Sequence, residues 1–278
     1  MTSAAPARQV LAVRYGYRVT TRAESYLNFH LYGEPDADLD IDYFFWVIRE
    51  PDGDVILVDT GFAPEAGDRR RREHHTTPAQ ALPSLGMRPD DVTTIVITHG
   101  HWDHTGNIGQ FPRAHLVLTE AEYDFWTGPL AARTQFAAHS EPDEIAQLER
   151  ARGQDRLTLF SGQHALAPGI DLIEVGGHTP GQLIVSVATD GGPVPGGPIP
   201  ANTVILASDA VHFYDETERD RPFAIVADLP AMYRAYDTLT QLAAQPTTHI
   251  VAGHDPLVQA RFAPHPTSPD ATDLTTPR

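Results

Sequence analysis

Runs of β-branched and aromatic residues near the start of the chain predict strands at residues 10–15, 26–31 and 41–49. The Pro-Asp-Gly-Asp sequence at 51–54 predicts a hairpin turn, because Asp-Gly readily adopts the backbone of a tight turn. We therefore expect residues 55–59 to return as the next strand, so that the chain opens with an antiparallel meander.

After this meander, apolar runs alternate with helical patterns. The apolar runs predict strands at 92–98, 115–118, 157–160, 170–175, 183–188, 203–207 and 249–251. The helical patterns lie at 77–85, 105–111, 120–126, 143–152 and 229–243. A Gly- and Pro-rich run at 191–200 predicts an exposed loop between two strands. This pattern predicts an α/β fold, an αββα sandwich of two mixed β-sheets with helices on the outer faces.

The length of 278 residues suits one large domain or two small ones, and we expect a single domain over residues 1–262. Residues 263–278 are rich in Pro, Thr and Asp, which predicts a loosely ordered tail. The first residues are small and polar, and no apolar stretch has the length of a signal peptide or a membrane helix. We therefore expect a cytoplasmic protein.

Charge and cysteine content exclude several classes of partner and site. The chain has 20 basic residues, all of them Arg, against 37 acidic residues, so its net charge is −17. A chain this acidic repels phosphate groups, and we expect neither a nucleic-acid nor a membrane partner. Because the chain has no cysteine, any metal must be held by His, Asp, Glu or backbone oxygen.

A dense cluster of metal-ligand types follows the predicted strand at 92–98. Four candidates lie within six residues, namely His99, His101, Asp103 and His104. So tight a spacing leaves little room for all four on one tetrahedral ion and fits a pair of ions better.

Three more candidates each follow a predicted strand. They are His178 in Gly-Gly-His-Thr-Pro-Gly, Asp209 in Ala-Ser-Asp-Ala, and His254 in Ala-Gly-His-Asp-Pro. Small flanking residues would let these loops approach one another closely. A lone His-x-His pair is usually incidental, but this risk falls as independent matches accumulate.

The seven candidates resemble the ligands of the metallo-β-lactamase superfamily. Its His-x-His-x-Asp-His motif is complete at 99–104, the later His, Asp and His follow in the superfamily's order, and Val58-Asp59-Thr60-Gly61 is a further match. The resemblance implies two ligand sets, one of His99, His101 and His178 and one of Asp103, His104 and His254. It also implies that Asp209 bridges the two ions together with a hydroxide, and that Asp59 orients a ligand imidazole from behind.

Such a centre supplies a nucleophile at neutral pH, because the cations lower the pKa of bound water. Asp103 would orient the hydroxide or pass a proton to the leaving group. Esters, lactones, thioesters, amides and phosphodiesters all stay open on this argument alone. Within the superfamily, a bridging Asp209 argues against a β-lactam substrate, and the net charge argues against the nuclease branch. Only two Arg follow His254, which is a weak match to a glutathione thioesterase.

The segment 208–214, the Arg-Pro-Phe at 221–223 and the Gly-His-Asp-Pro at 253–256 most resemble the N-acyl-homoserine lactonases. This resemblance implies opening of a lactone ring, as in quorum quenching. Known members have a Tyr three residues after the bridging Asp, to hydrogen-bond the lactone carbonyl. Here His212 occupies that position and Tyr214 lies two residues further on. Either residue could donate to the carbonyl, or both could be structural.

The expected cofactors are two divalent metal ions, with zinc first and Fe, Mn or Co as alternatives. The expected partner is a small lactone or ester, and a homodimer is left open. The alternatives are another lactonase, an esterase or a thioesterase like glyoxalase II on the same site, or a binding module in which the metals act as a staple.

Two further features concern the substrate pocket. Aromatic candidates for an acyl pocket are Tyr26, Phe29, Phe44, Phe45, Phe125, Trp126 and Phe213, although most aromatic residues belong to a core. The basic run at 68–75 could form a lid near the site. Dense charge runs are more often solvated, and we expect this one to be so.

Overall fold

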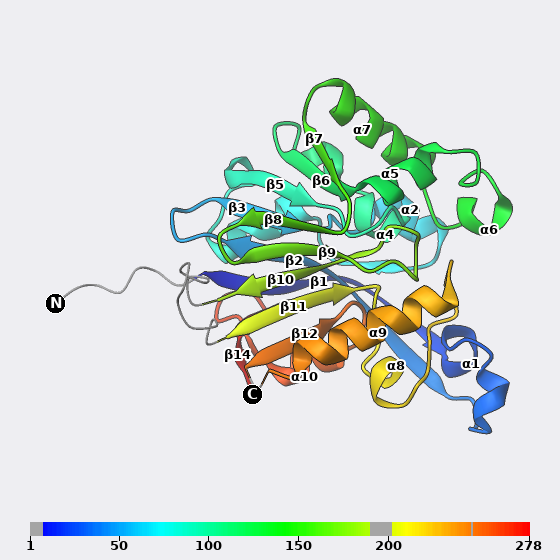
Figure 1. The fold of residues 1–278 in the computed structure, drawn as a ribbon. Coiled ribbons are helices and arrows are strands. Elements are labelled where there is room, and N and C mark those ends of the chain that lie inside the picture. Colours follow the sequence, from blue (N-terminus) through cyan, green and yellow to red (C-terminus); the bar gives the residue numbers. More distant parts are fainter. Residues whose placement is uncertain (1–7, 190–201, 246) are drawn as a thin grey trace.

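The computed structural model describes residues 8–189, 202–245 and 247–278 and arranges them as two packed β-sheets between layers of helices (Figure 1). The first sheet has the order β13-β14-β1-β2-β3-β5-β6-β7, with β4 paired to β1, and the second has the order β12-β11-β10-β9-β8. Both sheets mix parallel and antiparallel pairs. The predicted αββα sandwich is therefore confirmed.

The first sheet is built mainly from the first half of the chain. Its strands are β1 (Gln9–Thr21), β2 (Asp38–Arg49), β3 (Val55–Val58), β4 (Glu73–His74), β5 (Val92–Val96), β6 (His115–Thr119), β7 (Leu157–Phe160), β13 (Phe262–Pro264) and β14 (Ala271–Pro277). Residues 41–48 of β2 are all buried, because this strand is covered on both faces. The turn at 51–54 joins β2 to β3 as an antiparallel hairpin, as predicted.

The second sheet comes from the second half. Its strands are β8 (Gln163–Ala167), β9 (Ile170–Glu174), β10 (Leu183–Ala188), β11 (Thr203–Ser208) and β12 (Thr248–Ala252). The two sheets share one hydrophobic core, to which β10 and β11 contribute almost wholly buried strands. The predicted loop at 191–200 lies outside the described residues.

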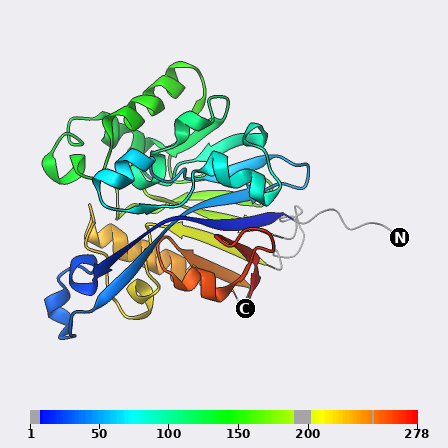
Figure 2. The same ribbon diagram turned by 180° about the vertical axis from the view of Figure 1, so that it is seen from behind.

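Amphipathic helices cover the outer faces, as both views show (Figures 1 and 2). Helices α5 (Glu120–Thr127) and α7 (Pro142–Gly153) pack on β6 and β7, and α9 (Leu229–Ala243) packs on β12. In α7 the buried side chains Ile145, Leu148 and Ala151 recur every three residues and so form one face. Among the described residues, no helix is long and apolar enough to cross a bilayer.

The remaining helices are short. They are α1 (Arg22–Ser25), α2 (Pro64–Arg69), α3 (Pro78–Ala81), α4 (Trp102–Thr105), α6 (Thr134–Ala137), α8 (Asp215–Glu218) and α10 (Leu257–Arg261), with 3₁₀ turns η1 (Phe29–Tyr32), η2 (Leu82–Leu85), η3 (Pro89–Asp91) and η4 (Ile108–Gln110). The predicted strand at 26–31 is wrong. Asn28 takes a positive φ of 50° there, which turns the chain into η1.

The C-terminal segment also differs from the prediction of a loosely ordered tail. Residues 271–277 form β14, which pairs antiparallel with β1 and extends the first sheet. Ala271 and Leu274 are buried there. Composition pointed to disorder because Pro, Thr and Asp dominate the segment, yet two apolar side chains and a free sheet edge suffice to order it.

Candidate metal centre

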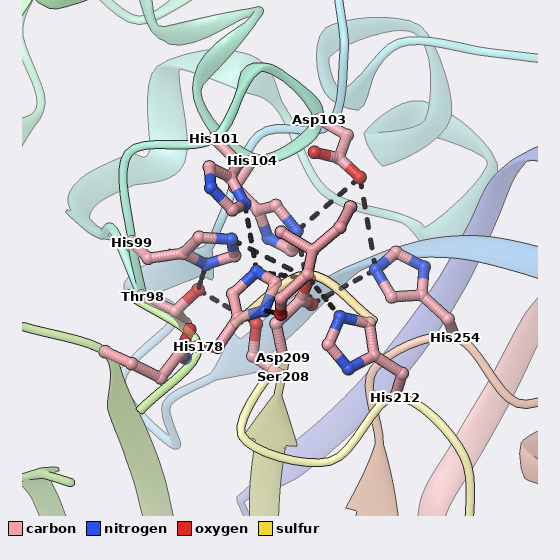
Figure 3. A network of polar contacts seen from close by, with 12 residues as sticks. Thr98, His99, His101, Asp103, His104, His178, Ser208, Asp209, His212 and His254 are labelled. Atoms are coloured by element: carbon pink, nitrogen blue, oxygen red, sulfur yellow. Dashed lines mark hydrogen bonds and ion pairs between the residues drawn. The ribbon is translucent and has the colours of Figure 1, made fainter. Parts of the chain in front are cut away.

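The predicted ligands point toward one another (Figure 3), from loops that follow strands of both sheets. The loop after β5 carries His99, His101, Asp103 and His104, and α4 contains the last two of these. His178, Asp209 and His254 follow β9, β11 and β12. Loops at the carboxyl ends of parallel strands lie side by side, and here the same holds across two sheets.

The side chains form overlapping clusters whose nitrogen and oxygen atoms lie within 4.8 Å of one another. One cluster contains His99, His101, His178 and Asp209, and a second contains Asp103, His104 and His254. A third joins His212 to Asp209 and His254. The structure thus brings all seven predicted ligands into one place, and His212 joins them.

Asp209 lies between the two sets. Its Oδ2 is 3.3 Å from His178 Nε2 and 3.7 Å from His99 Nε2. Its Oδ1 is 3.1 Å from His254 Nε2 and 3.3 Å from His104 Nε2. One carboxylate oxygen therefore faces each set, which is the geometry required of a ligand shared by two ions.

Three imidazoles are held from behind through Nδ1. His104 Nδ1 lies 2.7 Å from Asp59 Oδ2, His178 Nδ1 donates to Ile225 O at 2.8 Å, and His254 Nδ1 donates to Asp42 O at 2.8 Å. These contacts fix the ring orientations and direct each Nε2 toward Asp209. The same Asp59 carboxylate accepts hydrogen bonds from the backbone and the hydroxyl of Thr98, so it also fixes the start of the ligand loop.

On one side of the centre, low pKa values keep three imidazoles unprotonated, so that their lone pairs are free. Burial lowers the pKa of His99, His101 and His178 well below the usual range, and repulsion among neighbouring imidazoles adds to this effect. His104 differs: burial also acts to lower its pKa, but the carboxylates of Asp209 and Asp59 raise it well above the usual value.

Asp209 is the anion that these imidazoles surround. Burial acts to raise its pKa, but His212, His254 and His104 together lower it well below the usual range. The ionised carboxylate is the form of Asp209 that binds metal ions.

The residues present fit divalent metal ions. The Nε2 atoms of His99 and His104 are buried and have no hydrogen-bond partner among the described residues. Buried nitrogens of this kind are costly unless something binds them. A set of imidazole and carboxylate donors without thiolates suits zinc and also iron, manganese or cobalt.

The three predicted catalytic residues lie in different surroundings. Asp103 is the more exposed carboxylate at the centre, with Oδ2 3.8 Å from His104 Nε2 and 4.0 Å from His254 Nε2. His212 is buried, with Nε2 3.0 Å from Asp209 Oδ2, and its ring is stacked 3.7 Å from that of Phe223.

Tyr214 does not reach the centre. Its hydroxyl donates to Ile250 O at 3.2 Å, and Arg261 lies 3.5 Å from its ring. The structure therefore favours the structural alternative for Tyr214, because its hydroxyl has a partner within the core beside β12.

Glu122 is a contributor that the sequence prediction missed. It is fully buried in α5, and its carboxylate accepts hydrogen bonds from the backbone of Gly100 and of Gly181, each at 2.8 Å. It also accepts from Trp126 Nε1. A signal was present, since Glu122 and Trp126 are four residues apart on one face of the predicted helix.

The centre opens into a cavity of about 350 Å³. Besides the ligands, its lining includes Arg18, Tyr43, Arg70, Arg72, Trp102 and Phe223. A second cavity of about 170 Å³ shares His101 and His178 with it and is lined by Phe125, Trp126, Phe136 and Val226. The centre therefore lies between a lobe that carries Arg side chains and a lobe lined mainly by aromatic and aliphatic side chains, here called the apolar lobe.

These linings test two predictions from the sequence. Phe125 and Trp126 line the apolar lobe, whereas the other aromatic candidates are buried in the core. The basic run at 68–75 is not wholly solvated: Arg71 is exposed, but Arg70 and Arg72 face the larger cavity.

Comparisons with known proteins agree with this geometry. The model of the metallo-beta-lactamase superfamily matches residues 43–254. The N-acyl homoserine lactonase AiiB of Agrobacterium fabrum is 27% identical over 238 residues, which cover 78% of this chain and 80% of that protein.

Solved structures share the fold. A quorum-quenching N-acyl homoserine lactone lactonase superimposes with a TM-score of 0.71 at 19% identity, covering 93% of this chain and 96% of the other. A dizinc quorum-quenching lactonase with a bound N-hexanoyl-L-homoserine product superimposes with a TM-score of 0.68 at 19% identity. The match covers 96% of this chain and 94% of the other. At such identities these two likenesses concern the fold alone.

Proposed function

Because this chain belongs to the metallo-β-lactamase superfamily, we propose that it is a metal-dependent hydrolase that opens the ring of N-acyl-homoserine lactones. The observation that carries the proposal is the position of Asp209 among the seven candidate ligands, because its two oxygens face different sets of imidazoles. The names of the relatives support the lactone as the substrate class.

Two divalent cations, with zinc as the first candidate, would be held by the two ligand sets. His99, His101 and His178 would form one set, and Asp103, His104 and His254 the other, with Asp209 shared between them. When bound, the ions would ionise a water molecule at neutral pH and polarise the ester carbonyl. Asp59 keeps the His104 ring in place from behind.

The chain's own residues would then position the substrate and move protons. Asp103 is partly exposed at the cavity and so can accept a proton and return it to the leaving alkoxide. His212 lines the same cavity and is the candidate that would hydrogen-bond the lactone carbonyl. The apolar lobe around Phe125 and Phe136 offers a place for an uncharged part of the substrate.

The proposal is tested by measuring ring opening through proton release. The purified protein, loaded separately with zinc, iron, manganese or cobalt, is given N-acyl-homoserine lactones of several chain lengths. Turnover that is lost on chelation and restored by metal is expected. No turnover with any metal would contradict the proposal, and release of free thiol from thioesters in its place would make the protein a thioesterase. Metal analysis of the same samples measures whether two ions bind per chain.

A further inference from the structure

Arg72 presents an unneutralised charge to the larger cavity. It is half-buried, its Nε donates to the Tyr43 hydroxyl at 2.8 Å, and its Nη1 donates to the backbone oxygen of Arg70. Both acceptors are neutral. Among the described residues, no carboxylate lies within ion-pair distance of Arg72, so its remaining N–H groups are available to an anion.

Arg18 brings a second positive charge to the same wall. Strands β1 and β4 pair Gly16 with His74 and Tyr17 with Glu73, so Arg18 and Arg72 adjoin the same end of this pairing, and both line the cavity. Arg18 contacts Glu24 at 3.3 Å, but that carboxylate is 67% exposed and screens it weakly. Like charges facing each other across two strands are unfavourable unless an anion lies between or beside them.

Arg70 also lines the cavity, but unlike Arg72 it has a carboxylate partner. Its Nη1 pairs with Glu141, and its guanidinium lies 4.5 Å from the Trp102 ring. Its charge is therefore already compensated. The carboxylates that line the cavity, Asp103 and Asp209, belong to the metal centre. In a chain with a net charge of −17, two Arg side chains that line a cavity and have no buried carboxylate partner stand out as a site for an anion.

Building on the lactone hydrolase proposed above, we propose that Arg72 and Arg18 form a carboxylate-binding subsite, and that the preferred substrate is a lactone whose acyl part carries a carboxylate. The planar guanidinium group offers parallel N–H donors that match the two oxygens of a carboxylate. The Tyr43 hydroxyl holds Arg72 at the cavity wall, so little side-chain freedom is lost on binding.

A matched pair of substrates tests the subsite. N-adipoyl- and N-hexanoyl-homoserine lactone have acyl chains of equal length, but the former ends in a carboxylate and the latter in a methyl group. For the metal-loaded wild type we expect kcat/KM to be higher for the adipoyl compound by about tenfold, because a charge-assisted hydrogen bond is added. Arg72→Gln should remove most of this ratio. Arg71→Gln removes the same charge from an exposed neighbour and should keep the ratio.

Two outcomes would overturn the subsite while leaving the lactonase intact. One is a wild-type ratio at or below one, and the other is an equal fall of both rates in Arg72→Gln, which would place Arg72 at the reacting centre instead. Adipate binding to the metal-loaded protein, measured by calorimetry, gives a second readout that needs no turnover. We expect about tenfold weaker binding in Arg72→Gln and no change in Arg71→Gln. If no lactone were opened, the proposed function would fail, and adipate would still decide the subsite.

Discussion

Glu122 accepts a hydrogen bond from the backbone nitrogen of Gly100 at 2.8 Å, and so fixes the ligand loop between its first two histidines. The second oxygen of the same carboxylate accepts from Gly181, three residues beyond His178. One buried side chain of α5 thus ties together two loops that come from different sheets. The metal centre depends in this way on a helix that contributes no ligand.

This relationship predicts the effect of Glu122→Gln. In the variant, an amide NH₂ group would replace one of the two carboxylate oxygens that accept backbone N–H groups. That N–H would lose its acceptor, and a buried donor left unsatisfied costs about 2 kcal/mol. We expect a lower free energy of unfolding and weaker metal retention, measured by denaturant titration and by metal analysis after dialysis. Glu120→Gln, at an exposed position of the same helix, is the control and should change neither. Equal behaviour of the two variants would refute the positioning role.

Gly253 allows His254 to approach the Asp209 loop. A Cβ at this position would lie 2.6 Å from Ser208 O and 3.0 Å from Asp209 Oδ1, so the two loops would have to separate. We expect Gly253→Ala to weaken metal binding at least about tenfold, measured with a competing chelator. Gly153→Ala is the matched control, since a Cβ there meets nothing within 4 Å. Retention of both ions by Gly253→Ala would contradict this account.

Glu144 is a buried acid beneath the ligand loop. Its Oε2 accepts a hydrogen bond from the Thr105 hydroxyl at 2.6 Å. Burial raises the pKa of Glu144 to about 8, and repulsion by Glu141 and Asp103 adds to this, while the Thr105 hydrogen bond and Arg70 oppose it. The folded protein therefore keeps this carboxyl protonated at a pH where the unfolded chain, with the ordinary glutamate value, has lost the proton.

The sign of the pH dependence follows. Because its folded pKa is raised, Glu144 contributes stability that is fully present below about pH 4.5 and is lost as the pH rises to about 8. We expect Tm to fall across this window in the wild type, and Glu144→Gln to flatten that fall. Glu149→Gln, exposed on the same helix, should retain the wild-type slope. Thermal melts at several pH values measure it, and a slope unchanged in Glu144→Gln would rule out Glu144 as its source.

Much of this centre could be predicted from the sequence because its ligands follow strand ends. His178, Asp209 and His254 each come within a few residues of the end of an apolar run, and strand ends meet at one edge of a sheet. The motif at 99–104 needed no tertiary information at all. The same local signal located most strands and the long helices, since their apolar periodicity is set by the faces they bury.

What the sequence could not supply were contacts made by side chains whose partners lie far along the chain. Tyr214 lies two residues after His212 in the chain, yet its hydroxyl donates a hydrogen bond to Ile250 O, away from the centre. Arg72 lies in a run of charges that resembles a solvated surface, yet the short pairing of β4 with β1 turns it into the cavity. For the tail, composition indicated disorder where an available strand edge ordered the segment.

The division of roles between His212 and Tyr214 gives the last prediction. His212 lines the cavity beside Asp209, so His212→Phe should remove a donor to the lactone carbonyl and lower kcat about 10²-fold while both metals stay bound. Tyr214→Phe loses a hydrogen bond to Ile250 O, at a cost of about 1 kcal/mol of stability, and should keep kcat within about twofold. Steady-state kinetics with parallel metal analysis separate the cases.

Loss of a metal ion from His212→Phe would make His212 a ligand, and a large fall in kcat for Tyr214→Phe would show that Tyr214 leaves its partner to reach the substrate. Either result would contradict the assignment of the carbonyl contact to His212. That assignment requires the His212 imidazole to face the cavity and not to be a metal ligand.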